Sequence, residues 1–169
     1  MSQSHLSVSQ KKVLKENFEK GRLFEEYVIK LFNSRFFYQK QWRKSKAFDD
    51  SYYLIDCVYP DIEMELVFID KRNYRFAVEC KWRQGFRNGV IKWANDKKIC
   101  HYRMFQDQVR IPVFIAIGIG GKPDNPEKLF LTPLNSIHMK NYLSESDLIP
   151  FERNPRQRFY YDYIQLALL

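Results

Sequence analysis

The segment that restricts the fold most is the apolar run Ile111–Ile119 (IPVFIAIGI). It is rich in β-branched residues and contains no charged residue, which is typical of a strand buried on both faces in a parallel position of a sheet. Before it, the loop Gly85–Gly89 is followed by a moderately amphipathic stretch from Val90 to about Gln106, which predicts a helix. A strand, a helix and then a buried strand predict a right-handed βαβ crossover.

Three earlier runs are predicted strands: Tyr52–Val58, Ile62–Ile69 and Arg75–Lys81. In the second run, apolar residues alternate with acidic ones, which is the period of a half-buried strand. The third run alternates in the same way. Asp70–Asn73 is short and polar, so the second and third runs are expected to form a hairpin.

The two ends of the chain are less regular. Residues 1–9 are a polar lead-in, and apolar residues three and four positions apart then predict a helix from about Gln10 to Phe37. The charged segment Lys40–Asp50 has no period and is expected to be an exposed connection. Leu129–Thr132 is expected to be a further strand, whereas the aromatic, basic tail after Pro150 gives no clear assignment.

The charge balance favours a polyanionic partner. There are 28 Lys and Arg residues against 20 Asp and Glu residues, a formal charge of +8. Such a field attracts nucleic acid, although membrane surfaces and acidic proteins are attracted by the same charge. At 169 residues and 45% hydrophobic, the chain suits one folded domain.

Cysteine and histidine give no sign of a zinc site or a disulfide framework. The three Cys and three His residues are scattered, without a metal-binding spacing. A reducing compartment fits best. The longest apolar run, Val113–Ile117, is too short to span a membrane, and no secretory signal is visible, so we expect a soluble, cytoplasmic protein that does not bind membranes.

Glu79-Cys80-Lys81 is the segment with the clearest chemistry. A carboxylate and an ammonium two residues apart on a strand leave from the same face and can meet one phosphate. Asp61, at the start of the partner strand, is expected on that face as well. Carboxylates that hold Mg²⁺ can activate water for phosphodiester hydrolysis, with Lys81 orienting or deprotonating the water or neutralising the phosphate. The alternative is a solvated salt bridge between Glu79 and Lys81.

Tyr59-Pro60-Asp61, followed after 17 residues by Val78-Glu79-Cys80-Lys81, resembles the motif of the PD-(D/E)XK nuclease superfamily. The segment Gly21–Val28 looks like the first-helix motif of its Holliday-junction-resolvase-like and Mrr-like branches. The resemblance spans roughly residues 21–119 and implies a restriction endonuclease-like α/β fold: a three-layer α-β-α core of order αβββαβ, with a mixed sheet of about four to five strands. Residues 120–169 would add a C-terminal strand and peripheral elements to this single nuclease-like domain.

By the same resemblance, Asp61, Glu79 and Glu25 are metal ligands for Mg²⁺, with Mn²⁺ as a substitute, and Lys81 is the catalytic lysine. Glu25 lies at the edge of the apolar stripe of the first helix, whereas Glu26 has Arg22 and Lys30 one turn away and suits a surface ion pair.

Two further choices stay open at this point. Glu63 could replace or supplement Asp61. Some branches also use a residue of the second helix, for which the candidates are Lys97, His101 and Gln106.

The expected activity is a metal-dependent endonuclease acting on DNA in restriction, repair or recombination. DNA is favoured over RNA, and cleavage of both strands would require a homodimer or another subunit. Basic residues interleaved with aromatic ones follow the catalytic strand, so Arg83, Arg87 and Lys92 are candidate nucleic-acid contacts. The alternative functions are a catalytically silent nuclease-fold protein that binds nucleic acid or protein, and a structural domain.

Overall fold

The computed structural model describes residues 7–43, 59–67, 73–137, 139–162, 164–165 and 167–169. The strand predicted at Tyr52–Val58 lies outside these residues. No helix in the described part of the chain is both long enough and apolar enough to cross a membrane.

Helix α1 spans Val8–Leu31 and begins with a capping box, in which Ser7 and Gln10 satisfy each other's backbone N–H groups. The predicted helix is therefore confirmed, but its predicted end at Phe37 is wrong. The chain turns after Phe32 through backbone hydrogen bonds to the Asn33 carbonyl, and strand β1 begins at Phe37.

Strand β1 (Phe37–Trp42) corrects the expectation that Lys40–Asp50 is entirely a connection. Among the residues that the structure describes, it is an edge strand that pairs with β2 alone, and four of its six residues are exposed. Polar side chains are common on edge strands because only one neighbour covers them. The sequence of β1 therefore lacks the alternation that identified the inner strands.

The central sheet has the order β1-β2-β3-β5-β6-β8 among the described residues. The predicted hairpin is confirmed as β2 (Ile62–Val67) antiparallel to β3 (Asn73–Arg83), and β5 (Val113–Ile119) runs parallel to β3, as the predicted crossover requires. β6 (Lys128–Pro133) and β8 (Glu152–Arg153) then add to the sheet in antiparallel fashion. The predicted mixed α/β class is confirmed, and the described residues contribute six strands to this sheet rather than four to five.

Helix α2 spans Asp96–Val109, not Val90 to Gln106. Asn88 and Gly89 have positive φ values of 52° and 76°, and they form a tight turn that sends the chain into strand β4 (Val90–Lys92). β4 pairs with β7 (Tyr142–Ser144) in a separate two-stranded sheet. The helix starts only at Asn95, whose side chain caps it by accepting from the Lys98 N–H.

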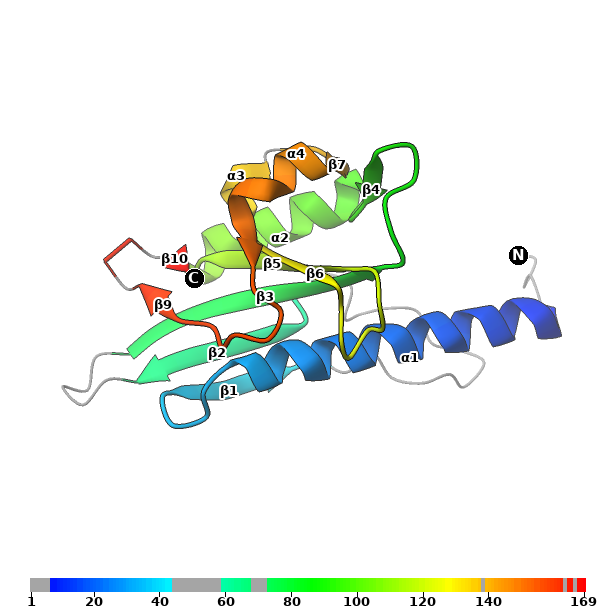
Figure 1. Cartoon of the computed structure of the whole chain (residues 1–169). Helices are drawn as coiled ribbons and strands as arrows, with labels where there is room; N and C mark the ends of the chain where they lie inside the picture. Colours follow the sequence, from blue (N-terminus) through cyan, green and yellow to red (C-terminus); the bar gives the residue numbers. More distant parts are fainter. Residues whose placement is uncertain (1–6, 44–58, 68–72, 138, 163, 166) are drawn as a thin grey trace, which may run out of the picture.

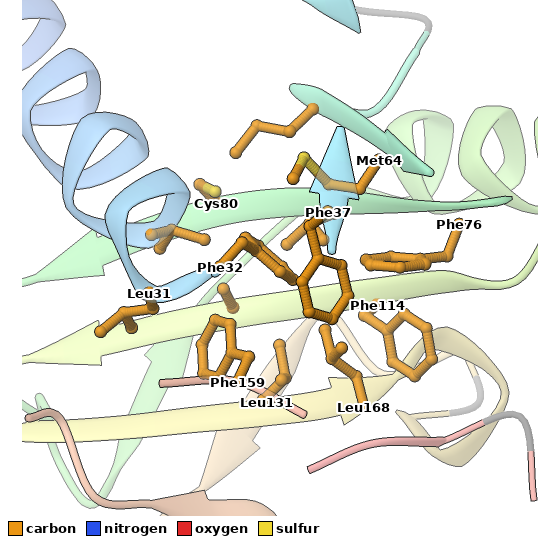
Figure 2. Packing of buried hydrophobic residues seen from close by; sticks show 14 of the residues in the cluster. Leu31, Phe32, Phe37, Met64, Phe76, Cys80, Phe114, Leu131, Phe159 and Leu168 are labelled. Carbon is orange, nitrogen blue, oxygen red and sulfur yellow. The ribbon is translucent and has the colours of Figure 1, made fainter. Parts of the chain in front are cut away.

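The two long helices cover opposite faces of the sheet (Figure 1), and each covers its own apolar cluster. Phe24 and Val28 of α1 pack with Phe76 and Val78 of β3, in the aromatic-rich cluster shown in Figure 2. Ile99 and other α2 residues pack on the face that carries Ala77, Ile115 and Ile117. β5 is buried along its whole length, as its composition predicts.

The unassigned tail completes the first of these clusters through Phe159, Tyr161 and Leu168. The remaining short elements are α3 (Leu134–Ile137), α4 (Glu145–Leu148), the 3-10 helix Ile149–Phe151, β9 (Tyr161–Asp162) and β10 (Ala167–Leu168).

Gly118 of β5 gives a test of the packing between α1 and the sheet. A Cβ atom at this position would lie 2.4 Å from Cε2 of the fully buried Phe24. We therefore expect Gly118→Ala to lower the free energy of unfolding by about 1–3 kcal/mol, measured by urea denaturation. Gly21→Ala is the matched control: it has open space within 4 Å and should stabilise α1 by about 0.5–1 kcal/mol. A Gly118→Ala protein as stable as the wild type would contradict this packing.

Candidate active site

Asp61 lies where the chain enters β2. Ile62 pairs with Val78 in the antiparallel ladder, so Asp61, one residue earlier, comes next to Glu79, one residue later. Oδ2 of Asp61 accepts a hydrogen bond from the backbone N–H of Cys80 at 2.7 Å. The side chain of Asp61 is thereby fixed against β3 at the position that the motif predicts.

Glu79 and Lys81 both come from β3 and form an ion pair through Oε1 of Glu79. The Glu79 residue is only 1% exposed, whereas Lys81 is partly accessible. The second carboxylate oxygen of Glu79, Oε2, is buried and has no hydrogen-bond partner. A buried anionic oxygen without a donor is costly, and it is one that a cation could satisfy.

Glu25 reaches the same place from α1. It is buried, and its Oε2 accepts a hydrogen bond of 2.7 Å from the indole N–H of Trp42. Glu26, the alternative, instead forms an ion pair with Arg22 on the partly exposed side of the helix. Of the two neighbours, the structure places Glu25 beside the other carboxylates.

Glu63 is buried, but its two oxygens are taken up by two guanidinium groups. Oε1 pairs with Arg43, and Oε2 pairs with Arg75 at 2.9 Å. These contacts give Glu63 a structural role in the β1–β2–β3 sheet and leave Asp61 as the acidic residue next to Glu79.

Arg43 holds the segment that carries Asp61. Its guanidinium donates to the Pro60 carbonyl at 2.8 Å and lies 5.1 Å from the ring centroid of Tyr59 and 5.8 Å from that of Phe105. Its backbone N–H donates to the Asp61 carbonyl at 2.8 Å. Arg43 therefore ties the Tyr-Pro-Asp segment to the end of β1 and to α2.

Trp42 and Arg43 are site residues that the sequence reasoning missed, because both fall in the segment predicted as an exposed connection. They are adjacent at the end of β1, yet one contacts Glu25 and the other contacts the backbone of Asp61. The one feature of the sequence that could have indicated their role is a tryptophan followed by an arginine within that charged segment.

The electrostatics of the site are unbalanced. Burial raises the pKa of Asp61 well above its ordinary 3.8, and the charges of Glu79 and Glu25 add to the rise. Burial also raises the pKa of Glu25, again with a contribution from Glu79. Burial alone would lower the pKa of Lys81, but the charges of Glu79 and Asp61 raise it above its ordinary value. Three carboxyl groups thus share one ammonium, and the site favours an additional cation.

Within the described part of the chain, no three Asp, Glu, His or Cys side chains are arranged to hold a metal ion as they stand. Asp61 and Glu25 each have one oxygen held by a protein donor, and Glu79 has one held by Lys81. The unpartnered Oε2 of Glu79 and the hard oxygen donors nevertheless fit Mg²⁺ in chemical kind.

Of the three candidates on the second helix, Gln106 has a structural role. Oε1 of Gln106 accepts from the backbone N–H of Val113, at the start of β5. Val113 pairs with Ala77, four residues before Lys81, which corresponds to about 13 Å along the strand. Gln106 therefore lies away from the site. Lys97 is exposed and His101 is half-buried.

The three candidate nucleic-acid contacts differ in how exposed their side chains are. Arg83 is half-buried, and its guanidinium donates to the carbonyls of Lys92 and Trp82, each at 2.9 Å. Arg87 and Lys92 are exposed. Arg83 therefore joins β3 to β4, whereas the other two cations point to solvent.

Comparison with known proteins gives a likeness of fold. No protein-family model and no curated protein sequence matches the chain. Among solved structures, the chain is similar to Hjc of Archaeoglobus fulgidus, a Holliday junction resolvase from an archaeal hyperthermophile, with a TM-score of 0.53 and 14% sequence identity. The match covers 83% of this chain and 99% of the resolvase. The chain thus shares the fold of this resolvase, which agrees with the fold class expected from the sequence.

The raised pKa of Asp61 predicts how stability depends on pH. A carboxyl group whose pKa is higher in the folded than in the unfolded chain destabilises the fold, increasingly as the pH rises from the unfolded value, near 3.8, to the folded one. Asp61→Asn removes that ionisation and keeps an oxygen for the Cys80 N–H. Without metal, we therefore expect the variant to be more stable than the wild type at neutral pH, and the difference to close as the pH falls towards 3.8.

Urea denaturation in EDTA across this pH range measures the effect. Asp107→Asn is the control, because Asp107 is exposed on α2 and its replacement should leave the pH dependence unchanged. An Asp61→Asn protein that is less stable than the wild type at neutral pH would show that the charge of Asp61 is well compensated.

Proposed function

We propose that this protein is a metal-dependent endonuclease that hydrolyses phosphodiester bonds in DNA. Asp61, Glu79 and Glu25 are the proposed ligands of Mg²⁺, for which Mn²⁺ can substitute, and Lys81 is the proposed catalytic lysine. The observation that carries the proposal is the buried group of three carboxylates around one ammonium, in which Oε2 of Glu79 has no partner.

The protein's own residues have separable tasks in this proposal. The Cys80 N–H orients Asp61, and the Trp42 indole N–H orients Glu25. Lys81 pairs with Glu79 as a cation, and in the same charged form it can donate to an oxygen of the reacting phosphate. When bound, the divalent ion would supply positive charge for the phosphate and lower the pKa of a water molecule.

DNA is the proposed substrate for two reasons. The net charge of +8 favours a polyanion, and the similar solved structure is that of an enzyme named for Holliday junctions. One centre of this kind cuts one strand, so we propose that cleavage of both strands uses a homodimer.

The proposal predicts a specific pattern of activity. With Mg²⁺, the wild type should cleave at least one of plasmid, nicked, branched or single-stranded DNA. Asp61→Ala, Glu79→Gln and Lys81→Ala should each lower the cleavage rate by about 100-fold or more, because the first two remove proposed Mg²⁺ ligands and the third removes positive charge at the reacting phosphate. Glu25→Gln should also lower the rate, and Glu26→Gln is its matched control, with expected activity within about twofold of the wild type.

Circular dichroism and thermal melting should show that each variant is folded. Cleavage that survives Lys81→Ala and Asp61→Ala would contradict the assignment of this site. DNA binding without cleavage by the wild type would instead favour the catalytically silent alternative.

A further inference from the structure

An open pocket of about 480 Å³ lies just beyond the catalytic segment of β3. Its volume falls within the roughly 300–1,000 Å³ that is usual for small-ligand sites. The residues that line it come from the end of β3, the following turn, β4 and β7: Arg83, Gln84, Gly85, Phe86, Arg87, Val90, Ile91, Lys92 and Tyr142.

The pocket is built by the β4–β7 pair, which the sequence did not predict. In this ladder Lys92 is opposite Tyr142, about 50 residues later in the chain. Nζ of Lys92 lies 5.7 Å from the centroid of the Tyr142 ring, and the tyrosine is 53% exposed. An aromatic ring is therefore presented to solvent beside a cation, which is an arrangement that suits a ligand with a flat ring and a negative charge.

The charges of the pocket suit an anion. Arg87 and Lys92 are exposed, and none of the described residues that line the pocket is acidic. Arg83, the last residue of β3, also lines the pocket and donates to the Lys92 carbonyl. The pocket thus combines exposed cationic groups with an accessible ring.

The pocket is close to the proposed active site. Arg83 follows Lys81 by two residues on the same strand, a rise of about 7 Å, and its charge opposes the raised pKa of Lys81. A nucleotide chain held at Lys81 could therefore reach the pocket within about two nucleotides.

We propose that this pocket is a subsite for one unstacked nucleotide, with its base against Tyr142 and its phosphates next to Arg87 and Lys92. The inference rests on the proposed function and narrows its substrate to DNA with unpaired nucleotides beside the cleaved bond, such as a flap, a single-stranded end or an opened junction. A site for duplex phosphates alone would need cations but no exposed ring, whereas base-aromatic stacking is how proteins commonly hold single strands.

Fluorescence anisotropy with the whole chain tests the proposal in EDTA, so that cleavage plays no part. The probes are a labelled oligo-dT strand and a blunt duplex of the same length. Tyr142→Ala should weaken binding of oligo-dT by roughly 5- to 100-fold and binding of the duplex by less than about twofold. Tyr142→Phe keeps the ring and should bind both probes like the wild type.

Tyr38→Ala is the matched control, because Tyr38 is 52% exposed but lies on the edge strand β1. It should leave both affinities unchanged. Lys92→Met should weaken binding of both probes and lower the salt dependence by about one counterion.

Equal binding of oligo-dT by Tyr142→Ala and the wild type would overturn the proposal, as would equal losses for the two probes. These readouts are independent of hydrolysis. A failure of the nuclease proposal would appear as no cleavage by the wild type, or as unchanged cleavage by Asp61→Ala and Lys81→Ala, while the selective effect of Tyr142→Ala would persist.

Discussion

The antiparallel register between β2 and β3 is the constraint on which the candidate site depends. With Ile62 opposite Val78, Asp61 comes next to Glu79, and its carboxylate reaches the Cys80 N–H. A shift by one residue would turn the acidic residues of β2 towards the opposite face, because side chains alternate along a strand. The register is secured by the apolar residues of both strands, which pack beneath α1. The same packing that stabilises the sheet therefore also brings the charged groups together.

The site gathers more negative charge than the protein neutralises. The ammonium of Lys81 stands among three carboxyl groups, and burial and mutual repulsion raise the pKa of Asp61 and Glu25. Such an arrangement lowers stability and is maintained only where the surrounding structure holds it in place. Trp42 and Arg43 supply much of that support, one through Glu25 and the other through the backbone that carries Asp61.

Most of the inner sheet was predictable, since β2 and β3 alternate in polarity and β5 is continuously apolar. The motif on β2 and β3 likewise indicated Asp61, Glu79 and Lys81. The edge strand β1 was not predictable from periodicity, because most of its residues face solvent, and with it Trp42 and Arg43 were missed. The early start predicted for α2 has another cause: the turn at Asn88-Gly89 and the pairing of β4 with β7 depend on a segment about 50 residues away, which local patterns do not reveal.

Asp61, Glu79 and Glu25 are proposed to bind one divalent cation together. Anomalous X-ray scattering from crystals of the protein soaked with Mn²⁺ tests it most directly. We expect one Mn²⁺ peak with oxygens of Asp61 and Glu79 at about 2.1 Å and Glu25 facing it, directly or through water. A well-ordered site without a peak at saturating Mn²⁺, or a peak held by other residues alone, would contradict it.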